Sequence, residues 1–284
     1  MTRKIACITL DVEADFFDPD ARVRLLDDEG LLKRYVSIIQ ANGIKVTAFL
    51  VTSLLERYGA AFKQLRDSIP LEFAIHSHAH DPVTPCSRAD IEQSVEAYRN
   101  FAGANPTGYR APFGHITREG LDTLLDLGFR YDSSIFPSIR PGRFGYSNLH
   151  LPSSPFKITR GEQSLLELPF ASLPGIRLIF SLSYIKLFGW GTYEFLLKPF
   201  PLPDQIVVLS HPHDFYFHLL AANVRAPEKP LLQRNARQAF ELFEKMIQYL
   251  CKAGYEFEFL STLCDSLETQ RLKEMPIERT VREH

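Results

Sequence analysis

The segment "KIACITLDVEAD" (Lys4 to Asp15) shows a pattern that recurs along the chain, an apolar strand followed directly by polar residues. The apolar run predicts a buried strand, and its period of two places Asp11, Glu13 and Asp15 on one side for as long as the strand lasts. Two carboxylates at a strand end can divide their work, one binding a metal and the other accepting a proton. The alternative interpretation is a solvated loop that caps the next helix.

Short apolar runs of this kind alternate with helical patterns over most of the chain. Further strands are predicted in "KVTAFLV" (45–51), "LEFAIHSH" (71–78) and "IVVLSHPHDF" (206–215), with amphipathic segments such as "EGLLKRYVSIIQANG" (29–43) between them. Alternating strands and helices favour a mainly parallel sheet, and the length suits about seven such units. We therefore predict an α/β fold, a distorted (β/α) barrel of about seven parallel strands, with its active site at the carboxyl ends of the strands.

Residues 1–284 are expected to form one catalytic domain, with an irregular insertion at about 137–203. The net charge of −2 and the pI near 6.5 argue against a nucleic-acid partner. The four cysteines are scattered and predict free thiols in a reducing compartment, so we expect a cytoplasmic protein. No apolar run reaches the length of about 18 residues that a transmembrane helix needs. The oligomeric state stays open.

The segment "IHSHAHDP" (Ile75 to Pro82) carries three of the nine histidines. His76 and His80 follow a predicted strand, and one tight turn can bring two such imidazoles together. A metal site of this kind needs a third, usually anionic, ligand and an open position for water. The alternative is a loop of surface histidines.

Other polar residues follow predicted strands further along the chain. Arg110 in "GYRAPFGH" (108–115) is suited to hold a carboxylate through a paired hydrogen bond, although a structural ion pair would look the same. Asp132 in "YDSSIFP" is an acid at another strand end. His211 follows four apolar residues and could equally be a histidine near the core.

Taken in order, these segments resemble the polysaccharide deacetylases of carbohydrate esterase family four. The resemblance rests on strand–Asp-x-Glu, HSxxH, RxPxG, a DSS strand end and LxH, and it runs from Ile5 to about Phe259. The family's usual second aspartate is replaced here by Val12. Some relatives instead carry an acid one position later, where this chain has Glu13.

The resemblance implies a role for each matching residue. Asp11 would be the general base, Arg110 would orient it, and His211 would donate a proton, supported by Asp132 or else by Glu167. The implied metal ligands are Glu13, His76 and His80, with Asp15 as the fallback for Glu13. Pro112 and Phe113 match the segment that stabilises the oxyanion, and Ser77 matches a residue that braces the loop. We expect His78 to be structural and Asp81 to fix a histidine tautomer.

The implied cofactor is a divalent metal ion, best matched by Zn²⁺, with Co²⁺, Ni²⁺, Fe²⁺ or Mn²⁺ also compatible with such ligands. The implied substrate is an N-acetylated saccharide of a cell-surface polysaccharide or a lipid-linked glycan precursor. His213 and Trp190 are candidate substrate contacts. Trp190 lies in an aromatic stretch (180–195) that could stack on sugars, contact a membrane peripherally or simply pack on the barrel. Alternative functions are an allantoinase-like cyclic-amide hydrolase and an inactive glycan-binding relative.

Overall fold

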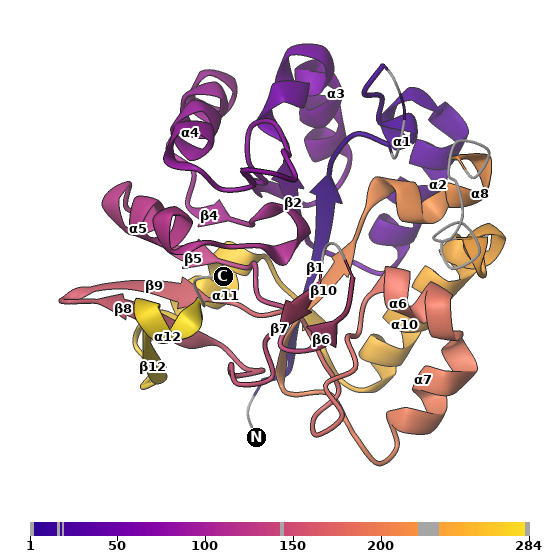
Figure 1. The fold of residues 1–284 in the computed structure, drawn as a ribbon. Coiled ribbons are helices and arrows are strands. Elements are labelled where there is room, and N and C mark those ends of the chain that lie inside the picture. Colours follow the sequence, from indigo (N-terminus) through magenta and orange to yellow (C-terminus); the bar gives the residue numbers. More distant parts are fainter. Residues whose placement is uncertain (1–2, 16–17, 19, 143–144, 221–232, 282–284) are drawn as a thin grey trace.

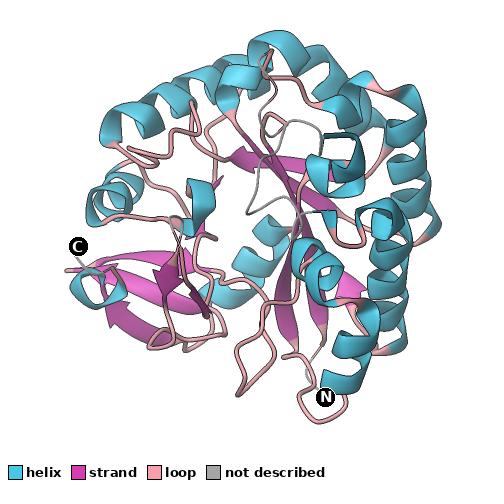
Figure 2. Cartoon of the chain, turned by 45° about the vertical axis from the view of Figure 1, so that its right-hand side comes forward, coloured by secondary structure: helices cyan, strands magenta, loops and turns pink. Residues whose placement is uncertain are grey.

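The computed structural model describes residues 3–15, 18, 20–142, 145–220 and 233–281. A mostly parallel sheet runs through the centre of the molecule, and helices surround its outer side (Figures 1 and 2). This arrangement follows from the sequence, because strands that are apolar along their whole length need cover on both faces. The first strand, β1 (Ile5–Val12), is buried at every position.

Seven strands make up the parallel part of the sheet, in the order β10–β1–β2–β3–β4–β5–β9. The other strands of this part are β2 (Val46–Leu50), β3 (Leu71–Ile75), β4 (Gly108–Tyr109), β5 (Tyr131–Asp132), β9 (Gln163–Glu167) and β10 (Gln205–Ser210). A further strand, β11 (Glu256–Phe257), pairs with the beginning of β1. The predicted α/β class and the number of parallel strands are confirmed.

The two ends of this strand order approach each other. Phe170, shortly after β9, forms a parallel bridge with Val207 of β10. The N–H of Ala171 donates a hydrogen bond of 2.8 Å to the carbonyl oxygen of Val207. The sheet therefore curls back on itself, as expected for a distorted barrel.

Helices lie between many of the consecutive strands, and four of the described α-helices begin at a residue whose side chain caps them. The carboxylate of Asp28 accepts the N–H groups of Gly30 and Leu31 at the start of α2 (Glu29–Ala41), and Ser87 caps α4 (Arg88–Ala102) in the same way. The remaining α-helices are α1 (Arg24–Asp27), α3 (Leu55–Ser68), α5 (Arg118–Asp126), α6 (Leu182–Phe188), α7 (Trp190–Leu196), α8 (Phe217–Leu220), α10 (Ala239–Lys252), α11 (Leu260–Glu268) and α12 (Ile277–Thr280).

The segment 137–203 is only partly an elaboration of the barrel. It contains the hairpin β6 (Ile139–Arg140) and β7 (Tyr146–Ser147), together with α6 and α7. It also contains β9, which pairs with β5, and β8 (Phe156–Arg160), which runs antiparallel to β9 and pairs with β12 (Lys273–Pro276). A segment predicted as an irregular insertion thus supplies one of the seven parallel strands.

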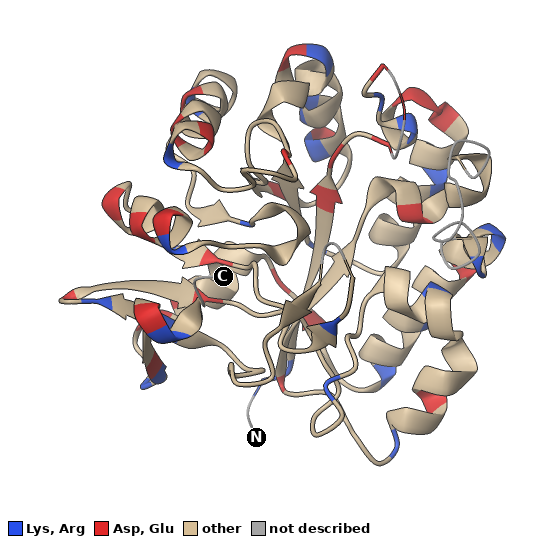
Figure 3. Ribbon diagram, in the orientation of Figure 1, with Lys and Arg blue, Asp and Glu red and all other residues tan. Residues whose placement is uncertain are grey.

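Charged residues of both signs lie on the outer helices α3 and α4, and acidic residues lie on α5 (Figure 3). Acidic residues also lie at the carboxyl end of β1, in the centre of the molecule. Within the described ranges, no helix has the length and apolar character needed to cross a membrane.

Candidate active site

Polar side chains from distant parts of the chain meet at the carboxyl ends of the parallel strands. Glu13 follows β1, while His76 and His80 follow β3. Their potential ligand atoms all lie within 4.8 Å of one another. The three residues that the sequence predicts as metal ligands therefore lie close together in the structure.

The donor set of these three residues fits a divalent metal ion. The Nε2 atom of His80 lies 2.6 Å from Oε2 of Glu13. The Nδ1 atom of His76 hydrogen-bonds to the carbonyl oxygen of Arg110 at 2.9 Å, which leaves Nε2 for the site. Two imidazole nitrogens and one carboxylate are a common ligand set for zinc, and an ion would replace the proton that His80 and Glu13 share.

Electrostatics within the trio favour the metal-binding protonation states of Glu13 and His76. For His80, burial lowers the pKa but the charge and hydrogen bond of Glu13 outweigh it and raise the pKa, so a bound metal would have to displace that proton. Burial opposes ionisation of Glu13, but the charge and hydrogen bond of His80 outweigh it and lower the pKa of the carboxyl group. Burial lowers the pKa of His76 to about 4, so its imidazole is neutral at pH 7. Neutral imidazole and ionised carboxylate are the forms that coordinate metals.

Asp11 lies beside this trio and is held by Arg110. The Nη1 group of Arg110 donates hydrogen bonds to Oδ1 of Asp11 and, at 2.9 Å, to Oγ1 of Thr9. Its Nε group donates to the carbonyl oxygen of Ser133 at 2.8 Å. The other carboxylate oxygen of Asp11 lies 3.8 Å from Nε2 of His76. Arg110 thus fixes one oxygen of Asp11 and leaves the other directed toward the metal-ligand trio.

His211 begins the turn after β10 and pairs with Asp214. Its backbone N–H and its Nδ1 atom lie 3.0 and 3.2 Å from Oδ2 of Asp214. Although burial lowers the pKa of His211, the hydrogen bond and the charge of Asp214 outweigh this and raise it to about 9. His211 is therefore protonated at neutral pH, as a proton donor must be.

His213 stacks against His211, with ring centroids 4.8 Å apart. Its Nδ1 atom lies 3.6 Å from Oε1 of Glu13, and only 6% of the residue is exposed. This burial disfavours the direct substrate contact predicted for His213 and makes it a packing partner of the site.

In the described residues His211 hydrogen-bonds to Asp214, whereas Asp132 and Glu167, the residues predicted to support it, have other partners. Asp132 accepts a 2.6 Å hydrogen bond from Oγ of Ser134, and the N–H of Ile135 donates a 3.0 Å hydrogen bond to Glu167. The two acids are register partners on the neighbouring strands β5 and β9, which directs them toward each other. The carboxylate that supports His211 is Asp214, and the i, i+3 spacing within "HPHD" was the sequence signal for it.

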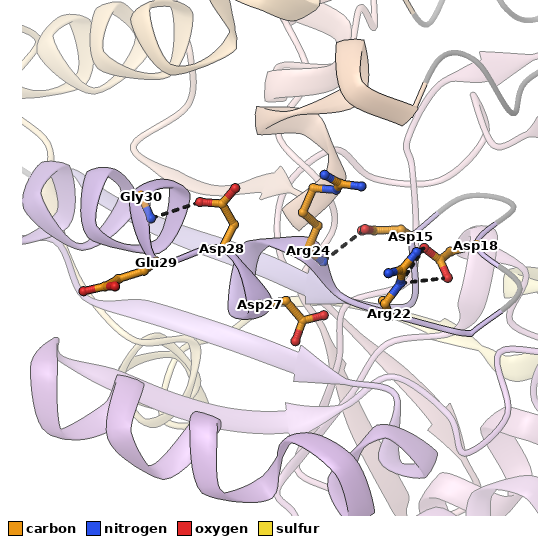
Figure 4. A pocket seen from close by; sticks show the side chains of 8 residues that line it. All are labelled: Asp15, Asp18, Arg22, Arg24, Asp27, Asp28, Glu29 and Gly30. Carbon is orange, nitrogen blue, oxygen red and sulfur yellow. Dashed lines mark hydrogen bonds and ion pairs between the residues drawn. The ribbon is translucent and has the colours of Figure 1, made fainter.

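Asp15 and Asp81 also have roles other than those predicted. Both carboxylate oxygens of Asp15 accept hydrogen bonds, one from the hydroxyl of Tyr216 and the other from the backbone N–H of Arg24 at 3.0 Å. Figure 4 shows Asp15 directed toward Arg24 in a pocket lined mainly by charged residues. Asp81 accepts from Val83 and Thr84 and so shapes a turn. The tautomer of His76 is fixed instead by a backbone carbonyl.

The RxPxG segment reaches the site through Phe113, whose ring centroid lies 4.8 Å from that of His80. Pro112 before it is buried. Trp190, in contrast, packs edge-on against Tyr249 of α10, with ring centroids 5.9 Å apart. The structure therefore favours the packing interpretation of Trp190 over the predicted sugar contact.

Three residues of the site have a left-handed backbone. Their φ angles are 66° at Ser77, 53° at His80 and 58° at Phe113. Side chains other than glycine rarely adopt this conformation, and it is concentrated at functional sites. The Oγ atom of Ser77 accepts the N–H of His80 at 2.9 Å, which stabilises the turn between the two histidines.

The family model of the polysaccharide deacetylases matches residues 8–131, which contain Asp11, the histidine segment and Arg110. Over these residues the chain is similar to the polysaccharide deacetylases, which are hydrolases acting on amide C–N bonds. No curated protein matches the chain in sequence.

Solved structures share the fold at low sequence identity. A proposed polysaccharide deacetylase from Mycobacterium smegmatis is 18% identical, with a TM-score of 0.59 over 96% of this chain and 93% of that one. A CE4 family pseudoenzyme from Bacillus anthracis is 13% identical, with a TM-score of 0.54 over 97% and 70% of the two chains. The 4-alpha-glucanotransferase from Thermococcus litoralis, 12% identical, reaches 0.60 over 97% and 42%. The fold thus serves different proteins, and the site residues must carry the functional argument.

Proposed function

We propose that this protein is a metal-dependent deacetylase that removes an N-acetyl or similar acyl group from an amino sugar. One observation carries the proposal. A metal-ligand trio, a carboxylate held by a buried arginine, and a histidine paired with an acid all lie at one end of the same sheet. Hydrolysis of an amide needs these three functions together, because water must be activated and the amine must leave as a protonated group.

Asp11 would accept the proton of the attacking water. A bound divalent ion would supply a Lewis acid that activates water and polarises the substrate carbonyl. Arg110 restrains one carboxylate oxygen of Asp11, so that the other oxygen remains available as a base. The backbone at Phe113 would stabilise charge on the carbonyl oxygen, as oxyanion sites do.

His211 would donate a proton to the leaving nitrogen. An amine that leaves as an anion is a very poor leaving group, so this proton decides whether the C–N bond breaks. The raised pKa of His211, about 9, keeps the ring protonated at neutral pH. The products would be acetate and a free amino sugar.

The proposed substrates are N-acetylated saccharides of a cell-surface glycan or of its lipid-linked precursor, and we propose a cytoplasmic precursor in keeping with the scattered cysteines. The family match supports this class of substrate. Zn²⁺ is the proposed ion, since two nitrogen ligands and one oxygen ligand suit it.

The decisive experiment is an acetate-release assay with N-acetylglucosamine oligomers and the zinc-loaded protein, run beside allantoin. We expect acetate release by the wild type and its loss in Asp11→Asn. Hydrolysis of allantoin without acetate release would replace the proposal by an allantoinase-like function. Saccharide binding with neither reaction would make the protein a binding relative.

A further inference from the structure

The buried ammonium group of Lys186 contacts Asp214, the same residue that pairs with His211. Lys186 of α6 is 5% exposed, and its Nζ atom donates hydrogen bonds of 2.9 Å to the backbone carbonyl oxygen and to Oδ1 of Asp214. Burying an ammonium group is costly unless it is paired and hydrogen-bonded, so this position is unusual for a lysine. The pairing makes α6 a neighbour of the proposed proton donor.

A second residue of α6 contacts the same carboxylate. The hydroxyl of Ser183 lies 3.0 and 2.9 Å from the two carboxylate oxygens of Asp214. Ser183 and Lys186 are three positions apart, which places both on one face of the helix. The carboxylate of Asp214 therefore has α6 on one side and His211 on the other.

The position of α6 is itself fixed from another part of the chain. The side-chain amide of Asn235 donates a 2.8 Å hydrogen bond to the carbonyl oxygen of Lys186. Ser181 caps the beginning of α6 by accepting the N–H of Tyr184. Lys186 thus projects from a helix that is held at both ends, and it can restrain Asp214.

We propose that Ser183 and Lys186 are positioning residues for the proton-donating step, acting through Asp214 on the ring of His211. The inference rests on the deacetylase function proposed above. Without the hydrogen bonds from Ser183 and Lys186, the carboxylate of Asp214 can rotate, and the hydrogen bond that orients His211 weakens. General acid catalysis contributes about 10²–10⁴-fold and depends on such alignment.

The other groups around His211 belong to the site and are not changed by altering α6. The charged groups that face its ring are Glu13, Asp11, His80 and Asp214, and His213 stacks on it. Variants at Ser183 and Lys186 leave all of these groups in place. They therefore change the restraint on Asp214 without removing the donor or the metal ligands.

Two substrates that differ in their leaving group test the role. The zinc-loaded wild type, Lys186→Met and Ser183→Ala are assayed on an N-acetylglucosamine oligomer and on 4-nitrophenyl acetate. A nitrophenolate leaves without a proton, whereas an amine requires one. We expect kcat for the acetamide to fall about tenfold or more in Lys186→Met at unchanged KM, with the ester rate kept within about twofold. Lys198→Met removes an exposed lysine shortly after α7. It is the matched control and should retain both rates.

Equal losses on both substrates would show a merely structural effect and overturn the inference, as would an unchanged acetamide rate. A wild type without either activity would instead remove the proposed function. The Nδ1 proton signal of His211 in NMR spectra separates the two questions. It should be sharp in the wild type and broadened in Lys186→Met, and identical signals would overturn the positioning role whether or not the protein is active.

Discussion

Arg110 donates a hydrogen bond to Asp11 across 99 positions of the sequence, and both side chains are almost completely buried. Arg110 leaves β4 and Asp11 lies near the end of β1, so the ion pair joins two strands that are not neighbours in the sheet. The pair can form only once β2 and β3 have assembled between them. The proposed base is therefore created by the tertiary fold.

Removing the charge of Asp11 should abolish most activity. We expect Asp11→Asn to lower kcat by about 10²–10⁴-fold, because the proton acceptor is lost while its shape is retained. The variant should also be less stable, since Arg110 would keep a buried charge without its carboxylate. Kinetics and thermal unfolding measure the two effects. Asp20→Asn, at an exposed position, is the control, and a variant that retains wild-type kcat would exclude Asp11 as the base.

The metal-ligand trio predicts a binding stoichiometry. Elemental analysis of untagged protein should find about one divalent ion per chain in the wild type and none in His76→Ala/His80→Ala. His78→Ala is a closely matched control, because His78 lies between the two ligands but contacts Thr52 instead. Wild-type protein that takes up no zinc or cobalt when supplied with them would contradict the proposed mechanism.

The pair of His211 and Asp214 predicts the alkaline side of the pH profile. A proton donor must be protonated, so kcat should be high at neutral pH and fall as the pH rises through about 9. Asp214→Asn removes the carboxylate that raises the pKa of His211, and the fall should then begin at a lower pH. An alkaline limb that does not move in this variant would assign it to another group.

The buried acids Asp132 and Glu167 predict how stability depends on pH. Burial raises the pKa of Asp132 to about 6, and burial together with the charge of Asp132 raises that of Glu167 well above its usual value. The folded protein therefore binds more protons than the unfolded chain above about pH 4, and stability should decrease as the pH rises.

Glu167→Gln should reduce this loss, because the amide keeps the hydrogen bond from the Ile135 N–H and carries no charge. Denaturant unfolding measures this at pH 5 and pH 8. Between the two pH values, the free energy of unfolding of the variant should rise relative to that of the wild type, by an amount on the order of 1 kcal/mol. Glu162→Gln, in the exposed turn before β9, should show no such difference. Equal pH dependence of the Glu167→Gln variant and the wild type would mean that the pair is ionised in the folded state.

The sequence was sufficient for the fold class and for the residues at the strand ends. Continuous apolar runs are distinctive of buried parallel strands, and the polar residues directly after them could be located by inspection. Glu13, His76, His80, Arg110 and His211 converge for this reason. β9 was not predicted as part of the barrel, because it lies in an irregular segment and pairs in parallel with one neighbour but antiparallel with the other.

The partners of the site residues were harder to predict than the site residues themselves. The choice between Asp132 and Asp214 as support for His211 depends on side-chain direction, which strand register and the turn at Pro212 determine. Lys186 lies within the aromatic stretch 180–195, and no local pattern marked it as a partner of Asp214, while Trp190 was a candidate substrate contact. Which face of α6 or α7 is buried depends on contacts with distant segments, and these have no local signature.

The left-handed residues Ser77, His80 and Phe113 bear on how this protein can be engineered. Glycine at Ser77 or Phe113 would relieve backbone strain, although at Ser77 it would also remove the hydrogen bond from the His80 N–H, so a stability screen would favour the change at Phe113. The same changes would let the histidine turn and the oxyanion segment sample many conformations, so that the ligand geometry is no longer built in before the metal binds. Such variants would be more heat-resistant but less active. Stabilising substitutions are therefore better placed on the outer helices.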